Sequence, residues 1–176
     1  MDSLFFIFFL SILILIFGTA ALAGLKAAPY VPTRQKDIKR LVELAEIKPG
    51  ELVYDLGAGD GRLVLATAKI YQAKAVGFEM SILPYLVSRL RVYFSRLNDR
   101  ANILYKDFYQ ADFSPADVIV CFLTPMAMSK LKPKFARELK SGARIVSYAF
   151  EIKDWLPDKI SKPSAKDTTI FRYLIK

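Results

Sequence analysis

Hydrophobic residues divide the chain into a short apolar segment and a longer region of alternating pattern. No residue from Leu4 to Leu25 is charged, and about 20 apolar residues are enough to cross a bilayer as a helix. Apolar residues then recur with a period near 3.6 over residues 34–47, which predicts an amphipathic helix. The prolines in the segment 29–32 favour an extended connection to this helix, and Thr33 is a suitable N-cap.

Beyond residue 50, patterns typical of strands and helices alternate. The expected strands are 51–56, 74–79, 102–105, 117–123, 143–150 and 168–175, and the expected helices are 60–71, 81–97 and 124–139. Regular β/α alternation predicts a doubly wound α/β fold with a mostly parallel sheet. The last strand has no helix before it, so we expect a hairpin with part of 155–163 and an antiparallel C-terminal edge.

The turn after the first of these strands has the composition of a ligand site. Glycines stand at every second position in Gly57-Ala-Gly59-Asp-Gly61, beginning two residues after Asp55, and a helical pattern resumes at Leu63. A parallel sheet leaves a crevice for a ligand at such a junction, and glycine lets a ligand approach the main chain closely. The alternative is an ordinary turn whose glycines serve only the backbone.

Acidic residues around this turn favour one kind of ligand. Asp55 and Asp60 would repel a pyrophosphate, but they suit an ammonium group such as the amino acid end of S-adenosylmethionine. Glu79 ends the next strand about 20 residues later, the usual place for an acid that accepts hydrogen bonds from ribose hydroxyls. The sequence therefore predicts S-adenosylmethionine as cofactor and disfavours a dinucleotide.

The charge distribution bears on the apolar segment. The net charge is +9 and every Lys and Arg follows that segment, beginning at Lys26. Ala21-Leu-Ala23 resembles a signal-peptide cleavage site, but Met1-Asp-Ser3 carries an acid where a signal peptide carries lysines. We therefore expect a retained single-pass anchor with the catalytic domain in the cytoplasm, by the positive-inside rule.

The basic residues also suggest partners. A basic domain beside an anchor suits an anionic membrane surface, and it would also suit nucleic acid, although the charges are spread over several expected helices. The single Cys121 lies in an apolar run and has no intrachain partner, which agrees with a reducing compartment and a core role.

Six short motifs carry a family resemblance that covers nearly the whole chain. They are Pro29–Thr33, Val53–Arg62, Gly77–Glu79, Lys106–Phe108, Phe122–Pro125, and Ser147–Phe150 followed by Asp154-Trp155. With them the sequence resembles class I S-adenosylmethionine-dependent methyltransferases. More narrowly, it resembles the small membrane-anchored lysine methyltransferases of adenine nucleotide translocase and ATP synthase c-subunit and their prokaryotic relatives. The resemblance implies a Rossmann-like, seven-stranded sheet.

The resemblance also implies a role for individual residues. The methionine end of the cofactor would lie against Asp55, Gly57, Ala58 and Gly59, the ribose against Glu79, and the adenine against Asp107 and Phe108. Tyr30 and Thr33 would fold over the cofactor, unless they simply join the anchor to the next helix. The alternative to an adenine contact is that Asp107 is an acidic loop residue and Phe108 an aromatic residue of the core. The acceptor side, with the candidate catalytic residues, would hold Thr124, Pro125 and Tyr148.

The acceptor is expected to be an amine that attacks once it is deprotonated. Methyltransferases of nucleobases typically carry Asn/Asp-Pro-Pro-Tyr where this chain has Phe122-Leu-Thr-Pro125, so nucleic acid is an unlikely substrate. The chain contains no histidine, so a histidine base is excluded; no other base stands out, and a metal site is not expected. We therefore expect methylation of lysine in a membrane or membrane-associated protein, with a lipid, quinone or other small amphiphile as the alternative acceptor. A cofactor-binding module without catalysis is a further alternative.

These expectations divide the chain into three parts. Residues 1–25 would form a transmembrane anchor, residues 26–49 a linker and N-terminal helix, and residues 50–176 the methyltransferase domain.

Overall fold

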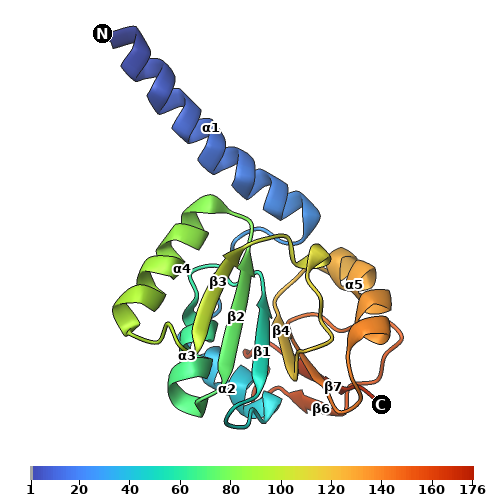
Figure 1. Cartoon of the computed structure of the whole chain (residues 1–176). Coiled ribbons are helices and arrows are strands. Elements are labelled where there is room, and N and C mark those ends of the chain that lie inside the picture. Colours follow the sequence, from blue (N-terminus) through green and yellow to red (C-terminus); the bar gives the residue numbers. More distant parts are fainter. Residues whose placement is uncertain (1) are drawn as a thin grey trace.

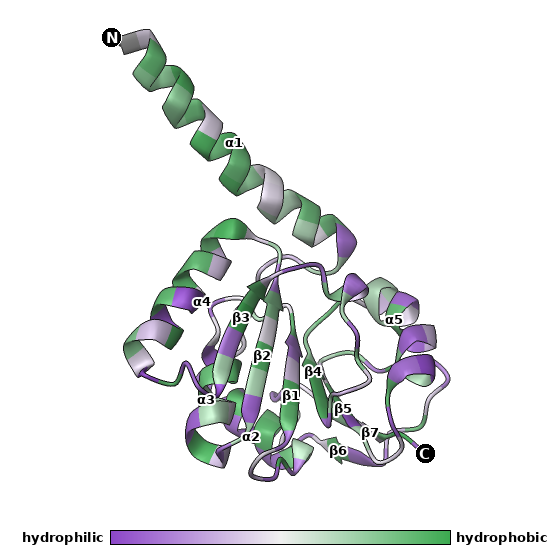
Figure 2. Ribbon diagram, in the orientation of Figure 1, coloured by the Kyte–Doolittle hydropathy of each residue, from purple (hydrophilic) through white to green (hydrophobic). Residues whose placement is uncertain are grey.

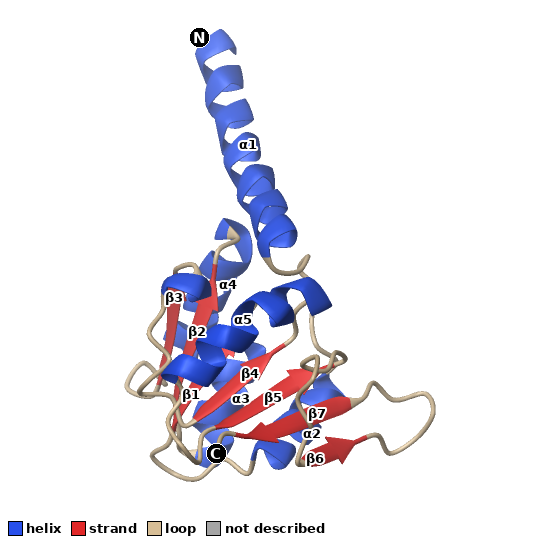
Figure 3. Ribbon diagram, turned by 90° about the vertical axis from the view of Figure 1, so that its right-hand side faces the viewer, coloured by secondary structure: helices blue, strands red, loops and turns tan. Residues whose placement is uncertain are grey.

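The computed structural model describes residues 2–176 and consists of a helix-covered sheet from which one long helix projects (Figure 1). The projecting helix is α1 (Asp2–Lys26). Figure 3 shows the twisted sheet with helices in front of it and behind it, and α1 leaving the domain beside the ends of the central strands.

The sheet has seven strands in the order β3-β2-β1-β4-β5-β7-β6. They are β1 (Leu52–Leu56), β2 (Lys74–Glu79), β3 (Ala101–Tyr105), β4 (Val118–Cys121), β5 (Arg144–Tyr148), β6 (Lys159–Ser161) and β7 (Ile170–Leu174). The first five pair in parallel, whereas β7 pairs antiparallel with both β5 and β6. The predicted mostly parallel, Rossmann-like sheet with an antiparallel C-terminal edge is confirmed.

Helices cover both faces of this sheet. They are α2 (Gln35–Ala45), α3 (Arg62–Tyr71), α4 (Ile82–Ser95), α5 (Pro125–Glu138) and the short 3₁₀ helix η1 (Phe108–Gln110). Side chains alternate across β4, so that Val118 and Val120 pack with α2 while Ile119 and Cys121 pack with α5. All four residues are almost fully buried, which explains why the strand is apolar throughout.

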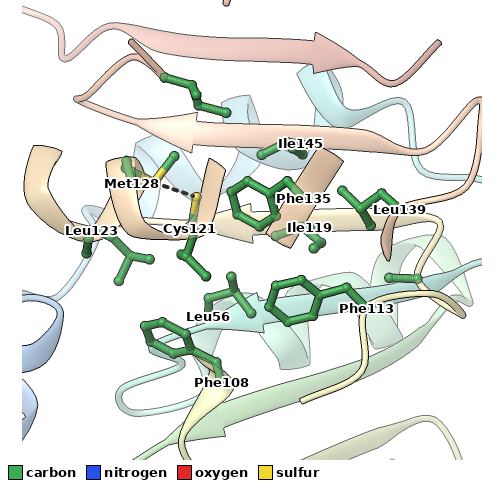
Figure 4. Packing of buried hydrophobic residues seen from close by; sticks show 14 of the residues in the cluster. Leu56, Phe108, Phe113, Ile119, Cys121, Leu123, Met128, Phe135, Leu139 and Ile145 are labelled. Carbon is green, nitrogen blue, oxygen red and sulfur yellow. Dashed lines mark hydrogen bonds between the residues drawn. The ribbon is translucent and has the colours of Figure 1, made fainter. Parts of the chain in front are cut away.

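The core on the α5 face is built from aromatic and branched side chains (Figure 4). Phe113 stacks on Phe135 with ring centroids 5.7 Å apart, and the Cys121 sulfur lies 3.7 Å from the sulfur of Met128. Cys121 is 1% exposed, and burial raises its pKa to about 12. The thiol is therefore a core group, as predicted.

One expected helix cap, at the start of α2, differs from the prediction. Thr33 is not the N-cap of α2, because the extended residue before the helix is Arg34. The Thr33 carbonyl instead accepts a hydrogen bond from Arg62. Ser81 is the N-cap of α4, but its side chain makes no capping bond, and its amide donates to the Glu79 carboxylate.

The helix α1 stands apart from the core. It is green along most of its length in the hydropathy view (Figure 2). Within the described residues, only its stretch Ser3–Lys26 is long and apolar enough to cross a membrane, a test that an N-terminal signal sequence also passes. Near its end, α1 touches α4, where Thr19 Oγ1 accepts a hydrogen bond from the amide of Ile82 at 3.2 Å.

Candidate cofactor and acceptor site

One cavity lies at the carboxyl ends of β1, β2 and β4, beside η1 and the segment 27–33. It contains all the residues predicted to bind the cofactor, which are Tyr30, Thr33, Asp55, Gly57, Ala58, Gly59, Glu79, Asp107 and Phe108. Tyr148, a predicted catalytic residue, also lines it, whereas Thr124 and Pro125 do not. Parallel strands bring these segments together because their carboxyl ends share one edge of the sheet.

The acidic character of the cavity comes from Asp55 and Glu79. Asp55 is 8% exposed, and burial together with the nearby Glu79 and Asp60 charges raises its pKa to about 8. The two oxygens of Glu79 accept hydrogen bonds from the amides of Gly59 at 2.8 Å and Ser81 at 2.7 Å. Each carboxylate oxygen retains acceptor capacity beyond that bond, so Glu79 is fixed in place and can still accept from a ligand.

The negative charge of Asp60 is compensated within the protein, which the sequence interpretation did not include. Its carboxylate lies 2.6 Å from Arg62 Nη2 and 2.5 Å from Arg91 Nη1. Burial alone would raise the pKa of Asp60, but the hydrogen bonds and charges of these two guanidinium groups lower it. A single aspartate between two arginines is structural, so a cationic ligand would face Asp55 and Glu79.

Glycines make room for close contacts around the turn. At Gly59, whose φ is +55°, an added Cβ would lie 2.7 Å from Cε2 of Tyr30, so the Tyr30 ring rests directly on the main chain. At Gly77 in β2, an added Cβ would lie 2.5 Å from Cβ of Ala58. The turn can therefore pack against β2 only because residue 77 has no side chain.

The segment 27–33 is attached to the domain at both ends. At its start, Thr124 Oγ1 donates to the Ala27 carbonyl at 2.6 Å, and the Thr124 amide donates to the same oxygen at 3.3 Å. At its end, Arg62 Nη1 donates to the Thr33 carbonyl at 2.9 Å. Thr124 also caps α5, whose first residue is Pro125, so both residues act outside the cavity wall.

Each carboxylate oxygen of Asp107 has one partner within the protein. Its Oδ2 lies 2.9 Å from Nζ of Lys26, the last residue of α1, and its Oδ1 accepts from the Tyr109 amide at 3.0 Å. The Tyr109 hydroxyl donates to the Lys26 carbonyl at 3.2 Å. Phe108 is 4% exposed and belongs to the core cluster that borders the cavity. The end of α1 is thus bound to the residues predicted to hold the adenine.

Tyr148 closes the cavity at the end of β5. Its hydroxyl donates to Asp37 Oδ2 at 2.8 Å, and Arg40 Nη1 lies 2.7 Å from the other oxygen of Asp37. The ring of Phe122 meets that of Tyr148 edge to face, with centroids 4.8 Å apart. Burial, followed by the interaction with Asp37, raises the pKa of Tyr148, so the hydroxyl stays protonated near neutral pH.

Sequence reasoning missed four residues at this site: Lys26, Asp37, Arg62 and Tyr109. Each makes its contact to a residue that is distant in sequence. Of these four residues, only Arg62 lies within a motif named in the sequence analysis, the segment Val53–Arg62.

The arrangement fits S-adenosylmethionine. Buried carboxylates at the ends of β1 and β2 suit an amine, a sulfonium and a ribose, and the glycine turn lets the ligand approach the backbone. The free volume between the side chains is about 90 Å³, below the ~300 Å³ of ordinary ligand pockets. Side chains that line the cavity therefore have to move when a nucleoside enters. No group of three or more His, Cys, Asp or Glu side chains that could hold a metal is found among residues 2–176.

Comparison with protein families gives a match over residues 55–159 to the ANTKMT methyltransferase domain. A protein-lysine N-methyltransferase of Saccharolobus islandicus is 37% identical over 84% of this chain and 93% of its own length. The human lysine N-methyltransferase of the ATP synthase c-subunit is 36% identical over 76% of this chain. The chain spans 56% of the length of that human protein.

Solved structures show the same fold with a bound cofactor product. The crystal structure of an RNA methyltransferase from Salinibacter ruber in complex with S-adenosyl-L-homocysteine is 31% identical. It covers 82% of this chain and 94% of its own chain with a TM-score of 0.78. A methyltransferase from Geobacter sulfurreducens, also with S-adenosyl-L-homocysteine, has a TM-score of 0.59 at 24% identity over 66% of this chain and 49% of its own, and shows the fold alone.

Proposed function

Because the chain belongs to the ANTKMT methyltransferase domain family, we propose that it N-methylates lysine in a membrane or membrane-associated protein. It is an S-adenosylmethionine-dependent methyltransferase close to protein-lysine N-methyltransferases. The observation that carries the proposal is the position of the cavity at the end of α1. Ala23 and Lys26 of this apolar helix line the same cavity as Asp55 and Glu79.

The location follows from α1 and the charge distribution. In our proposal α1 is a retained single-pass anchor, corresponding to residues 1–25 of the sequence division. The linker and α2 fill residues 26–49, and residues 50–176 form the catalytic domain. All 26 Lys and Arg residues follow Leu25, so the positive-inside rule puts the domain in the cytoplasm, against an anionic membrane surface. A cavity next to the anchor would receive lysines close to the bilayer.

The cofactor roles proposed for this chain keep the assignments made from the sequence. Asp55 and the turn Gly57-Ala58-Gly59 would hold the methionine end, Glu79 the ribose, and Asp107 with Phe108 the adenine. Tyr30 and Thr33 would cover the bound molecule. When bound, S-adenosylmethionine supplies an electrophilic methyl group, and the protein needs mainly to align the acceptor and exclude water.

The acceptor side is proposed to lie at Tyr148 and Phe122. A lysine amine has an unperturbed pKa near 10.4 and must lose its proton before it attacks. Aromatic walls at this end of the cavity would desolvate the amine, which favours its neutral form. Thr124 and Pro125 would shape this end indirectly, because Thr124 fixes the segment that starts at Ala27.

The proposal is tested by tracing a labelled methyl group. Membranes from cells that lack the protein would be incubated with the purified full chain and labelled S-adenosylmethionine. Protein, lipid and nucleic acid would then be separated, and the protein fraction hydrolysed to identify methylated lysine. The matched inactive control is Asp55→Asn, which removes the ionisable group from the cavity with little change in shape.

We expect label in methyl-lysine of a membrane protein, and none with Asp55→Asn. Label only in the lipid extract would instead support a lipid, quinone or other small amphiphile as acceptor, and label only in nucleic acid would support the substrate class of the Salinibacter ruber relative. Either result would overturn lysine methylation.

The anchor is tested separately. If alkaline pH extracts the protein from membranes, α1 is not a transmembrane anchor, but the proposed methyl transfer is unaffected.

A further inference from the structure

The outer face of α4 carries an unusual row of exposed apolar side chains. The exposed fractions are 51% for Leu83, 50% for Leu86, 57% for Leu90, 67% for Tyr93 and 76% for Phe94. Only Ser88 and Val92 of this helix are buried. The apolar face of a surface helix normally points toward the core, so α4 has its main apolar face on the opposite side.

Helical geometry shows that these side chains form one continuous stripe. At about 100° per residue, the five exposed residues and Val87 fall within an arc of about 120°, centred opposite Val92. We refer to Leu83, Leu86, Leu90, Tyr93 and Phe94 as the α4 stripe. Arginines flank it on both sides, with Arg91 on one side and Arg89 and Arg96 on the other, and all three are exposed. An apolar face bordered by basic residues is typical of helices that lie in a membrane interface.

The α4 stripe also adjoins α1. The two helices meet where the Ile82 amide donates to Thr19 Oγ1, one residue before Leu83. In Figure 1, α4 runs across the direction of α1 and not alongside it, on the side of the domain to which α1 projects. If α1 crosses a bilayer, α4 therefore lies along the bilayer surface with its outer face toward the lipid.

From these observations we infer that α4 is a second membrane contact, in which the α4 stripe enters the interfacial layer of an anionic bilayer while the flanking Arg89 and Arg96 meet the lipid phosphates. This inference rests on the proposed anchor α1. A lipid surface fits better than a second copy of the chain because basic residues border the stripe on both sides, and two copies would bring these like charges together. It also fits the continuity of the stripe with the apolar surface of α1.

The function of this contact is to fix the orientation of the domain. A single helix leaves a domain free to rotate about the helix axis, whereas two contacts define which side faces the membrane. The cavity lies between the C-terminal end of α1 and the ends of the strands that α4 covers. The opening of the cavity would therefore be held at a constant height above the bilayer.

The test compares two positions that are equally exposed in the structure. Leu90 in the stripe and Ile160 in β6 are both 57% exposed, and β6 lies at the far end of the domain from α1 (Figure 1). Full-length Leu90→Cys and Ile160→Cys would be labelled with an environment-sensitive fluorophore and reconstituted in phosphatidylcholine–phosphatidylglycerol vesicles. The unsubstituted chain serves as the labelling blank, because Cys121 is buried.

We expect the probe at position 90 to shift its emission to the blue and to be quenched by brominated phospholipid, and the probe at 160 to show neither change. Adding Leu86→Glu and Phe94→Glu to the Leu90→Cys protein should abolish both effects, although the protein still floats with the vesicles. These substitutions lie on the surface, so methyltransferase activity toward a soluble acceptor provides a check on folding.

Three outcomes would overturn the inference. If the protein floats with vesicles but the probe at position 90 has the same emission and the same lack of quenching as the probe at 160, the α4 contact is excluded and the proposed function stays intact. A blue shift that grows with protein density and resists brominated lipid would identify a second copy as the occupant. If the protein does not float with vesicles, both the proposed anchor and this inference are wrong. If only methyl transfer is missing, the proposed function is wrong and the inference stands.

Discussion

The ammonium of Lys26 lies 2.9 Å from the carboxylate of Asp107, so the last residue of the apolar helix α1 is bound to the residue proposed to hold the adenine of the cofactor. The pair joins positions 81 residues apart in sequence. Lys26 is about half exposed and Asp107 is mostly buried, so the pair is a contact at the rim of the cavity.

The first prediction follows from competition at this rim. If the adenine amine needs the Asp107 oxygen that Lys26 now occupies, Lys26→Ala should tighten S-adenosylmethionine binding. A partly exposed ion pair contributes at most about 1 kcal/mol, so the expected gain is up to about fivefold in Kd. Titration calorimetry measures it.

Lys36→Ala is the matched control, because Lys36 forms a similarly exposed pair with Asp167 outside the cavity. It should leave the affinity unchanged. Weaker binding by Lys26→Ala would mean that the lysine helps to hold the ligand.

The second prediction concerns the pH dependence of cofactor binding. The pKa of Asp55 is raised to about 8 by burial and the neighbouring acids, so its carboxyl group is mostly neutral at pH 7. A cationic ligand favours the carboxylate, so affinity should rise as the pH increases from 7 toward 8. Above about pH 8 the α-amino group of the ligand, whose unperturbed pKa is about 8, loses its own proton, and affinity should fall again. Asp55→Asn should bind weakly at every pH, whereas Asp99→Asn on the surface should retain the normal profile.

Asp55 should also affect stability, in the opposite direction. Its folded-state pKa of about 8 lies above the ordinary value of 3.8, so the ligand-free protein loses stability as pH rises from about 4 through about 8. Asp55→Asn removes this loss, and its Tm at pH 8 should exceed that of the unsubstituted protein. A lower Tm together with normal cofactor binding would contradict both the buried neutral carboxyl and its role toward the ligand.

The third prediction separates backbone strain from contact at Gly59. Gly59 and Gly142 both have positive φ, but only an added Cβ at Gly59 would meet another group, the Tyr30 ring at 2.7 Å. Denaturant unfolding should show a loss of about 1 kcal/mol for Gly142→Ala, from backbone strain alone, and a larger loss for Gly59→Ala, which adds the contact with the ring. Cofactor affinity should fall only for Gly59→Ala, because the displaced ring would no longer cover the ligand.

Adding Tyr30→Ala to Gly59→Ala tests the contact itself. The double variant should be more stable than Gly59→Ala, since the clash is relieved. Equal stability of the two would show that strain at residue 59, and not the ring, accounts for the effect.

The fourth prediction concerns the attachment of the segment 27–33. Thr124→Val keeps the shape of the side chain but removes the 2.6 Å hydrogen bond to the Ala27 carbonyl, which contributes about 1 kcal/mol. We expect about fivefold weaker cofactor binding and faster proteolysis within the segment. Thr124→Ser retains the hydroxyl and should restore both properties; failure of this rescue would argue that the methyl group matters instead.

The fold was largely predictable because its determinants are local. The apolar β4 segment indicated a strand covered on both faces, and the absence of a helix before 168–175 indicated the antiparallel edge. The placement of Asp55 and Glu79 in one cavity was also predictable, because both residues lie near the carboxyl ends of adjacent parallel strands.

The errors have a common physical origin. Asp60 was interpreted as part of the acidic crevice because the sequence does not show that Arg91, 31 residues away, neutralises it together with Arg62. Thr33 has the residue type of a helix cap. Its actual contact, the hydrogen bond from Arg62 to its carbonyl, depends on tertiary packing and cannot be read from the local sequence. Periodicity identified α4 as a helix, but it did not tell which side faces the sheet.

The arrangement of β7 has a consequence for biosynthesis. This strand is the last in sequence order, yet it lies between β5 and β6, and Tyr173 within it is buried and accepts a hydrogen bond from the Ile152 amide. During translation β5 has no neighbour on one side, and β6 has no strand partner at all, until residue 174 has left the ribosome. The nascent domain therefore has an open sheet edge at β5 until its last strand is complete, a natural binding site for chaperones.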